Sequence, residues 1–141
     1  MILVCGATGL IGGLVIDHLL CLKAPVRAML RTAGKMREFE QRGVDVVLGD
    51  FDQPPSLPKA LRDAQAVLLV SPSNPDMVRQ QCAMVEAIVA AGPPFPLIVK
   101  VSGFLTALDS ASQSGRWHAE IETEIARHQV PLTSLRPPFF M

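Results

Sequence analysis

Residues 6–12 read Gly6-Ala7-Thr8-Gly9-Leu10-Ile11-Gly12, with a glycine at every third position, and they follow the apolar run Ile2–Cys5 directly. The apolar spacing over Leu10–Leu22 predicts a helix, so this segment turns a buried strand into a helix. The first glycine permits the tight turn, the second lets the backbone approach a ligand, and the third allows close helix-to-strand packing. Because free N–H groups at a helix start attract anions, the segment predicts a diphosphate-binding turn and not only a tight one.

Apolar runs recur along the chain and alternate with helix-like stretches. Because these runs are almost continuously apolar, each strand is expected to be covered on both faces. The pattern predicts an α/β fold, a doubly wound parallel sheet of the Rossmann type, with about six strands and helices on both faces. The expected strands are Ile2–Cys5, Val26–Leu30, Val44–Leu48, Ala66–Val70, Leu97–Val101 and Val130–Leu135.

Capping residues and apolar spacing predict the helices. The side of the first helix that is expected to face the sheet carries Leu10, Ile11, Leu14, Val15, His18, Leu19 and Leu22. Asn74 is read as the N-cap of a helix that runs to Ala91. The expected helices are Leu10–Leu22, Gly34–Arg42, Ser56–Asp63 with a break at Pro58, the one capped by Asn74, and Arg116–Gln129.

Length and composition restrict the class of protein. A chain of 141 residues is long enough for one domain and too short for two, so residues 1–141 are expected to form a single domain. Its 13 basic residues balance 13 acidic ones, which leaves no net field to attract nucleic acid or an anionic membrane. Cys5, Cys21 and Cys82 form no C-x-x-C or Cys/His cluster, so neither a disulfide framework nor a metal site is expected. The short apolar N-terminus is no signal peptide or membrane span, and a reducing cytoplasm fits best.

The residue after the second predicted strand is Arg31, with Lys35 one turn further on. In dinucleotide-binding sheets this position meets the adenosine ribose, where an acid bonds the 2′-hydroxyl and an arginine accepts a 2′-phosphate. No acid stands at this strand end, so the pattern favours NADP(H) over NAD. The alternative is that both residues are ordinary solvated charges.

Later strand ends supply further predicted cofactor contacts. After the third strand, Phe51 offers the adenine an apolar wall, while Asp50 fits a turn residue equally well. Ser71 and Pro72 end the fourth strand and are expected near the second ribose, at the topological switch point. Asn74 fits a helix cap better than a ligand.

Motifs along the whole chain are similar, in the same order, to those of one known group. They are G-A-T-G-L-I-G at Gly6–Gly12, R-A-M-L-R at Arg27–Arg31, G-D-F-D at Gly49–Asp52, L-V-S-P at Leu69–Pro72 and L-R-P-P-F-F-M at Leu135–Met141. Together they resemble the NmrA-like family of atypical short-chain dehydrogenases/reductases. The resemblance implies an NADP-binding Rossmann fold, in reductases of quinones or other activated acceptors or in non-catalytic sensors of the NADP redox state. It further implies cofactor contacts from Thr8, Leu10, Ile11, Arg31, Lys35 and Ser71, with Arg136 and Pro137 bordering the nicotinamide.

The chain departs from that family at its C-terminus. Such proteins normally continue for roughly another 100 residues, which supply the substrate-binding lobe, whereas this sequence stops at Met141. We therefore expect a Rossmann half that lacks the C-terminal lobe and leaves the substrate pocket largely unspecified. An uncovered sheet edge and the apolar tail Phe139-Phe140-Met141 predict a homodimer formed through this edge.

The second departure is that the chain contains no tyrosine. The Tyr-x-x-x-Lys pair of ordinary short-chain dehydrogenases is therefore absent, which disfavours ketone reduction, because a forming alkoxide needs a positioned acid. Quinone reduction is less demanding, since the reduced oxygens can take protons from water. Ser102, after the fifth strand, could orient a substrate or form a plain turn. His118 could donate a proton or be structural, and no G-x-S-x-G elbow supports a hydrolase built from Ser102, His118 and Glu122.

These observations lead to a first hypothesis, an NADPH-dependent reductase of a small activated acceptor such as a quinone. The second hypothesis is a non-catalytic module that senses the NADP redox state. A sugar-nucleotide epimerase is the weaker alternative, because that branch shares the G-A-T-G start but depends on the missing tyrosine.

Overall fold

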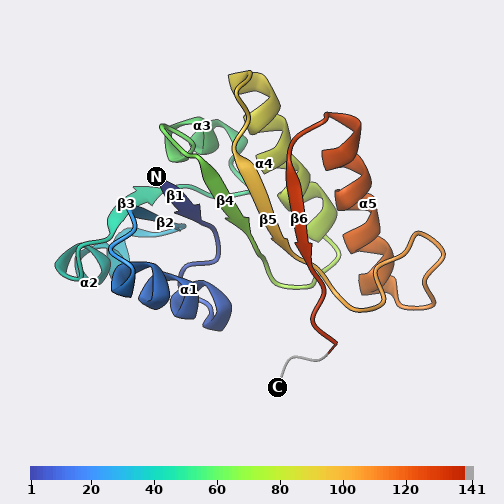
Figure 1. Cartoon of the computed structure of the whole chain (residues 1–141), viewed down its shortest axis with the longest axis horizontal. Helices are drawn as coiled ribbons and strands as arrows, with labels where there is room; N and C mark the ends of the chain where they lie inside the picture. The colour runs from blue at the N-terminus through green and yellow to red at the C-terminus, as the bar shows by residue number, and fades with distance from the viewer. Residues whose placement is uncertain (139–141) are drawn as a thin grey trace.

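The computed structural model describes residues 1–138, and the predicted pairing tail of residues 139–141 lies outside the described residues. Six strands form one parallel sheet in the order β3-β2-β1-β4-β5-β6 (Figure 1), which confirms the predicted doubly wound Rossmann sheet. The strands are β1 (Ile2–Val4), β2 (Val26–Leu30), β3 (Asp45–Leu48), β4 (Ala66–Leu69), β5 (Leu97–Val101) and β6 (Leu132–Leu135). The helices are α1 (Leu10–Cys21), α2 (Met36–Gln41), α3 (Leu57–Ala60), α4 (Met77–Ala91) and α5 (Gln113–Arg127), with 3-10 turns η1 (Ala33–Lys35) and η2 (Pro54–Ser56).

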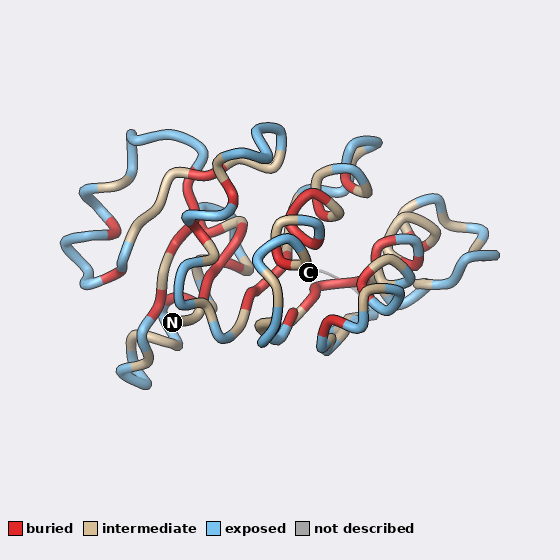
Figure 2. The backbone as a smooth tube through the Cα atoms, turned by 90° about the horizontal axis from the view of Figure 1, so that it is seen from above, coloured by how far each residue is buried: buried red, intermediate tan, exposed pale blue. Residues whose placement is uncertain are grey.

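Alternate strand residues point to opposite sides of the sheet, and both sides are apolar, which is why the strands read as continuous apolar runs. On one side, Ile16 of α1 and Phe39 of α2 share a buried cluster with Val4, Ala28 and Leu30. The buried stretches in Figure 2 follow the strands and the inner helix faces, while the outer helix faces are exposed.

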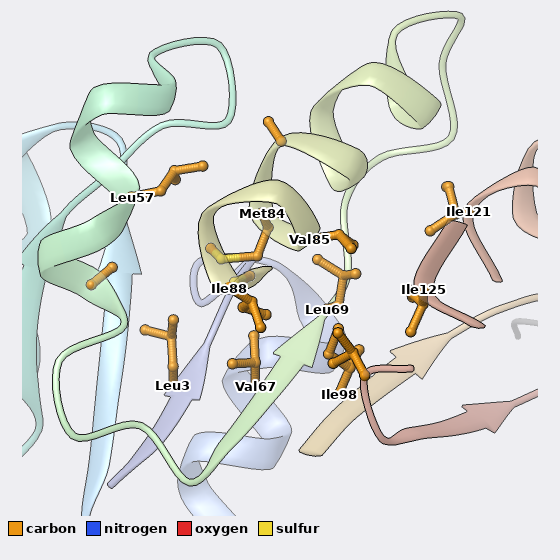
Figure 3. Close-up of a cluster of buried hydrophobic side chains, with 14 of the residues drawn as sticks. Leu3, Leu57, Val67, Leu69, Met84, Val85, Ile88, Ile98, Ile121 and Ile125 are labelled. Atoms are coloured by element: carbon orange, nitrogen blue, oxygen red, sulfur yellow. The ribbon is translucent and has the colours of Figure 1, made fainter. Parts of the chain in front are cut away.

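The opposite side of the sheet carries the larger buried cluster, which Figure 3 shows in close-up. Met84 and Ile88 of α4 pack there with Leu3 and Val67 of the central strands, and Ile121 of α5 extends the cluster. The helices do not cover the two sides equally, because on the α1 side Leu97 of β5 and Leu135 of β6 are exposed.

The strand order reverses between β1 and β4, because the chain leaves β1 towards β2 and later returns to the other side of β1. Val4 pairs with Ala28 on one side and with Leu68 on the other, so β1 lies between β2 and β4, and both neighbours extend past its last residue. In a parallel sheet such a reversal leaves a crevice at the carboxyl edge. The turn at residues 5–9 leads out of β1 at this crevice.

The predicted stripe of the first helix is right in part. Ile11, Val15 and Leu19 pack against the buried cluster, whereas the leucines of the stripe, Leu10, Leu14 and Leu22, are 58–73% exposed. Gly12 and Ile16, outside the predicted stripe, are the buried residues of α1, because apolar side chains surround this helix almost completely and their spacing alone does not fix its rotation. The close approach of Gly12 to the preceding turn decides the orientation.

The prediction that Asn74 caps α4 is wrong. The helix begins at Met77 with Asp76 in the capping position, and the Asp76 N–H donates to Asn74 Oδ1 at 2.9 Å. Asn74 thus closes a separate turn just before the helix, which is the common alternative use of an asparagine side chain.

Two other helices also differ from their predicted forms. Pro58 does not break a helix but lies in the first turn of α3, where its missing N–H costs no hydrogen bond. The helix α5 begins at Gln113, earlier than predicted, because Ser112 caps it by accepting a hydrogen bond from the Gly115 N–H at 3.3 Å. Within residues 1–138, every helix is too short or too polar to cross a lipid bilayer.

Candidate functional site

The turn after β1 has the geometry that its glycines predict. Gly6 adopts a φ of +65°, and the Gly9 N–H donates to Gly6 O at 2.9 Å. A Cβ on Gly12 would lie 2.2 Å from Gly6 O, so α1 passes the turn at a distance that only glycine allows. The Gly13 N–H donates to Gly9 O, and the amides of the first helical residues before it lack an acceptor within α1. They remain available to an anion.

A cleft of about 850 Å³ opens at the carboxyl edge of the sheet, around this turn. Its volume lies in the range of about 300–1,000 Å³ that is typical of small-molecule sites. The predicted cofactor residues that line it are Gly6, Thr8, Gly9, Leu10, Ile11, Gly12, Arg31, Lys35, Asp50, Phe51, Ser71 and Pro72. The lining residues that the sequence reasoning did not select as ligands are Ala7, Met29, Leu30, Thr32, Gly49, Asp52, Val70, Asn74 and Gln80.

The charges in this cleft leave a cation available. Arg31 and Lys35 line it and are exposed. The carboxylate of Asp52, on the same wall, accepts hydrogen bonds from Arg79 at 2.7 Å and from Gln80 at 3.1 Å. These bonds, that from Arg79 foremost, hold the pKa of Asp52 below its usual value. Because Arg79 balances Asp52, the guanidinium of Arg31 stays available to an anion.

The end of β4 is held in place by α4. Gln81 is only 1% exposed, and its Nε2 donates to Ser71 Oγ at 2.9 Å. This hydroxyl accepts a hydrogen bond from Gln81 and donates a long one, at 3.5 Å, to Pro72 O. Its proton can therefore turn to a better acceptor in the cleft. A ribose hydroxyl or a phosphate oxygen would serve as that acceptor.

A second polar cluster lies at the carboxyl end of β5, against α5. The fully buried Lys100 donates from Nζ to His118 Nδ1 at 2.8 Å and to Val101 O at 3.3 Å. Burial lowers the pKa of Lys100 to about 8. Burial, followed by the positive charge of Lys100, lowers the pKa of His118 to about 4, so the imidazole is neutral at pH 7.

Glu122, one turn further along α5, joins the ends of β5 and β6. Ser102 Oγ donates to one of its carboxylate oxygens at 2.6 Å, and the guanidinium of Arg136 donates to the other. Burial alone would raise the pKa of Glu122, but these hydrogen bonds hold it below its usual value. Ser102 therefore bonds to a carboxylate and not to His118, which is not the arrangement of a hydrolytic triad.

The two clusters occupy neighbouring strand ends. Leu69 pairs with Lys100 across β4 and β5, and this register brings Ser71 in the cleft level with Ser102. The predicted residues Ser102, His118, Arg136 and Pro137 do not themselves line the cleft.

Sequence reasoning missed the roles of Lys100 and Glu122. A lysine inside the otherwise apolar strand Leu97–Val101 was the available signal, because a buried ammonium must find hydrogen-bond partners. The partners themselves lie on α5, and no local pattern connects the two segments.

The low pKa of His118 predicts an acid-dependent loss of stability. Between about pH 6.5 and pH 4 the unfolded chain binds a proton that the folded chain excludes, so the free energy of unfolding falls as the pH falls. We expect a loss of about 1–2 kcal/mol, less than the full shift implies because the ring is partly exposed. Urea unfolding at pH 7 and pH 4.5 measures it. The loss should shrink in His118→Gln and persist in His128→Gln, and equal losses in both variants would contradict the assignment.

Comparison with known proteins places this geometry in context. The model of the NmrA-like family matches residues 1–141. The NAD(P)H azoreductase of Xenophilus azovorans is 38% identical over 141 residues, which are 100% of this chain and 49% of the azoreductase. The chain spans about half the length of the relatives that it matches.

Two solved structures with the same fold are complexes with NADP(H) or NADPH. The Citrobacter sp. triphenylmethane reductase complexed with NADP(H) superimposes with a TM-score of 0.86 at 32% identity, over 99% of this chain and 50% of the reductase. The NADPH-dependent quinone oxidoreductase of Escherichia coli, complexed with NADPH, superimposes with a TM-score of 0.86 at 28% identity, over 99% of this chain and 50% of that protein.

Proposed function

Because the chain belongs to the NmrA-like family, we propose that it binds NADP(H) in the cleft at the carboxyl edge of the sheet. The observation that carries the proposal is the close approach of Gly12 to Gly6, which forms a backbone cradle at the start of α1. A diphosphate fits this cradle because the first amides of α1 have no other acceptor. The residues that would hold it are Gly6, Thr8, Gly9, Leu10, Ile11 and Gly12.

The adenosine end would lie where the cleft carries its free cations. Arg31 and Lys35 would bind the 2′-phosphate, with Arg31 as the planar donor that phosphate geometry favours. Phe51 would cover the adenine and Asp50 would border it. The Ser71 hydroxyl, oriented by Gln81, and Pro72 would face the second ribose.

The proposed activity is NADPH-dependent reduction of a quinone or a similar activated acceptor. When bound, the nicotinamide supplies a hydride. Arg136 and Pro137 would border the nicotinamide side, and Ser102 and His118 would face the acceptor. The similar proteins include an azoreductase, a triphenylmethane reductase and a quinone oxidoreductase. These names support the proposal that this chain reduces an electron-poor acceptor.

Mixing the chain with NADPH and a simple quinone or azo dye tests the activity. We expect the nicotinamide absorbance to fall only when both the protein and the acceptor are present. The fall should be slower with NADH than with NADPH. The Gly12→Ala variant, in which the cradle is blocked, is the control for adventitious reduction. An absorbance loss equal to that of this control would refute the reductase proposal for this chain.

The alternative function, a sensor of the NADP redox state, makes a different demand. A sensor must bind NADP and NADPH with different affinities, because a ligand without differential affinity shifts no equilibrium. Calorimetry that gives equal affinities for both forms would exclude the sensor. Pairing of two copies through the open edge strand β6, and residence in the cytoplasm, stay predictions from the sequence.

A further inference from the structure

The interaction between Lys100 and His118 determines which nitrogen of the imidazole carries the proton. An ammonium group has donors and no acceptor, so the 2.8 Å contact requires His118 Nδ1 to be the acceptor. A neutral imidazole in this contact therefore carries its proton on Nε2. Within residues 1–138, the His118 ring makes one hydrogen bond, the contact between its Nδ1 and Lys100. The Nε2–H is therefore free to donate.

The free Nε2–H is on the side of the loop after β5. A Cβ built on Gly103 would lie 3.5 Å from His118 Cδ2 and 3.9 Å from Nε2, so this loop lies close to the Nε2 edge of the imidazole without filling the space beside it. The loop follows Ser102, which the strand register brings level with Ser71 of the cleft. His118 on α5 thus lies beside the strand end that neighbours the proposed nicotinamide side.

We propose that Lys100 is a positioning residue that holds His118 with its proton on Nε2, ready to donate. When His118 gives the Nε2 proton to the reduced acceptor, Lys100 passes a proton to Nδ1. The inference rests on the proposed reductase function. It explains how a histidine in this setting can serve as an acid: a neutral imidazole gives up its Nε2 proton readily only if Nδ1 gains one at the same time.

The proton and charge balance is complete without a further reagent. Hydride transfer leaves the acceptor with two more electrons and one negative charge. The His118 Nε2–H bond breaks and its proton goes to that anion, while one N–H of the Lys100 ammonium passes its proton to Nδ1. Lys100 is then a neutral amine. Water at the Nε2 side returns a proton to Nε2, and the Nδ1 proton goes back to Lys100.

Three neighbouring groups act on this pair. Glu122 on α5 favours the charged form of Lys100 and of His118, and its own charge is partly balanced by Arg136 after β6. Cys82 on α4 faces Lys100, but burial raises the pKa of its thiol to about 11, so it is neutral in the working range. The pair is thus expected to lose its relay proton when Lys100 deprotonates, near pH 8.

NMR of the chain labelled with ¹⁵N-histidine tests the positioning role without any turnover. We expect His118, assigned with His118→Gln, to show a protonated Nε2 and an unprotonated Nδ1 throughout the range from about pH 5 to pH 8. In Lys100→Met, which replaces the buried ammonium by an apolar side chain of similar length, both tautomers should appear and His118 should titrate at higher pH. A protonated Nδ1 in the wild type, or a Met variant with an unchanged spectrum, would overturn the proposal.

Turnover tests the proton transfer. We expect the wild-type rate of NADPH oxidation to fall above about pH 8, and Lys100→Met to be about tenfold slower at pH 7, because water can partly replace an acid. Lys100→Arg keeps a cation that does not release its proton, so it should be as slow as the Met variant; a wild-type rate would contradict the relay. A chain that binds NADPH but reduces no acceptor would refute the reductase function and with it the transfer step, while the NMR result would still decide the positioning role.

Discussion

Replacing Gly12 with alanine is expected to abolish detectable NADPH binding and to lower the free energy of unfolding by about 3 kcal/mol. The added Cβ would lie 2.2 Å from Gly6 O and 2.7 Å from Gly6 C, and both are backbone atoms that cannot rotate away. The helix α1 must then move away from the turn, which opens the amide cradle and disturbs the packing of Ile16. Urea unfolding and calorimetric titration with NADPH measure the two effects.

Gly13 provides a matched control for this substitution. It is the next residue in the same helix, and a Cβ there would lie 3.9 Å from Ala7 O, at ordinary contact distance. Because alanine favours helix over glycine, Gly13→Ala should raise stability by about 0.5–1 kcal/mol and leave NADPH affinity unchanged. Equal behaviour of the two variants would show that the glycine pattern has no role in holding the cofactor.

Replacing Arg31 with alanine should weaken NADPH binding by about 10- to 100-fold and leave NADH binding nearly unchanged. The expected loss corresponds to about 1.5–3 kcal/mol for a charge-assisted hydrogen bond to phosphate. Arg31 is available for this bond because Arg79 pairs with Asp52, an acidic residue of the cleft wall. Calorimetric titration with each cofactor gives the ratio directly.

The control for Arg31 is Arg37 of α2, which is exposed and does not line the cleft. Arg37→Ala removes the same charge from the same region, so a general electrostatic effect would weaken NADPH binding in both variants. We expect the Arg37 variant to bind NADPH as the wild type does. If Arg31→Ala lowers the affinities for NADH and NADPH equally, the group bound by Arg31 is not the 2′-phosphate.

The sheet could be predicted from sequence because its signals are local. Runs such as Val26–Leu30 are apolar throughout, and the glycines of residues 6–12 mark where the first strand becomes a helix. The face of α1 was predictable only in part: Ile11, Val15 and Leu19 pack as expected, but apolar residues surround that helix, and the close approach of Gly12 to Gly6 sets its rotation. The role of Asn74 depended on where α4 begins, and helix ends are set by capping contacts that spacing does not specify.

The sequence predicts those parts of the cleft that are formed by strand ends. Parallel strands bring their carboxyl ends to one edge, so Arg31, Asp50 and Ser71 converge without any further information. Partners that reach the site from later helices were not predictable, because Gln81 and His118 meet their strands only through the packing of α4 and α5. Arg136 was expected beside the nicotinamide, and its ion pair with Glu122 likewise appears only in three dimensions.

A crystal structure of the chain soaked with NADPH would show which residues hold each part of the cofactor. We expect the diphosphate against the first amides of α1, beside Gly9 and Gly12, and the 2′-phosphate in contact with Arg31. Nucleotide bound elsewhere on the molecule, or a 2′-phosphate that points into solvent away from Arg31, would contradict this binding mode.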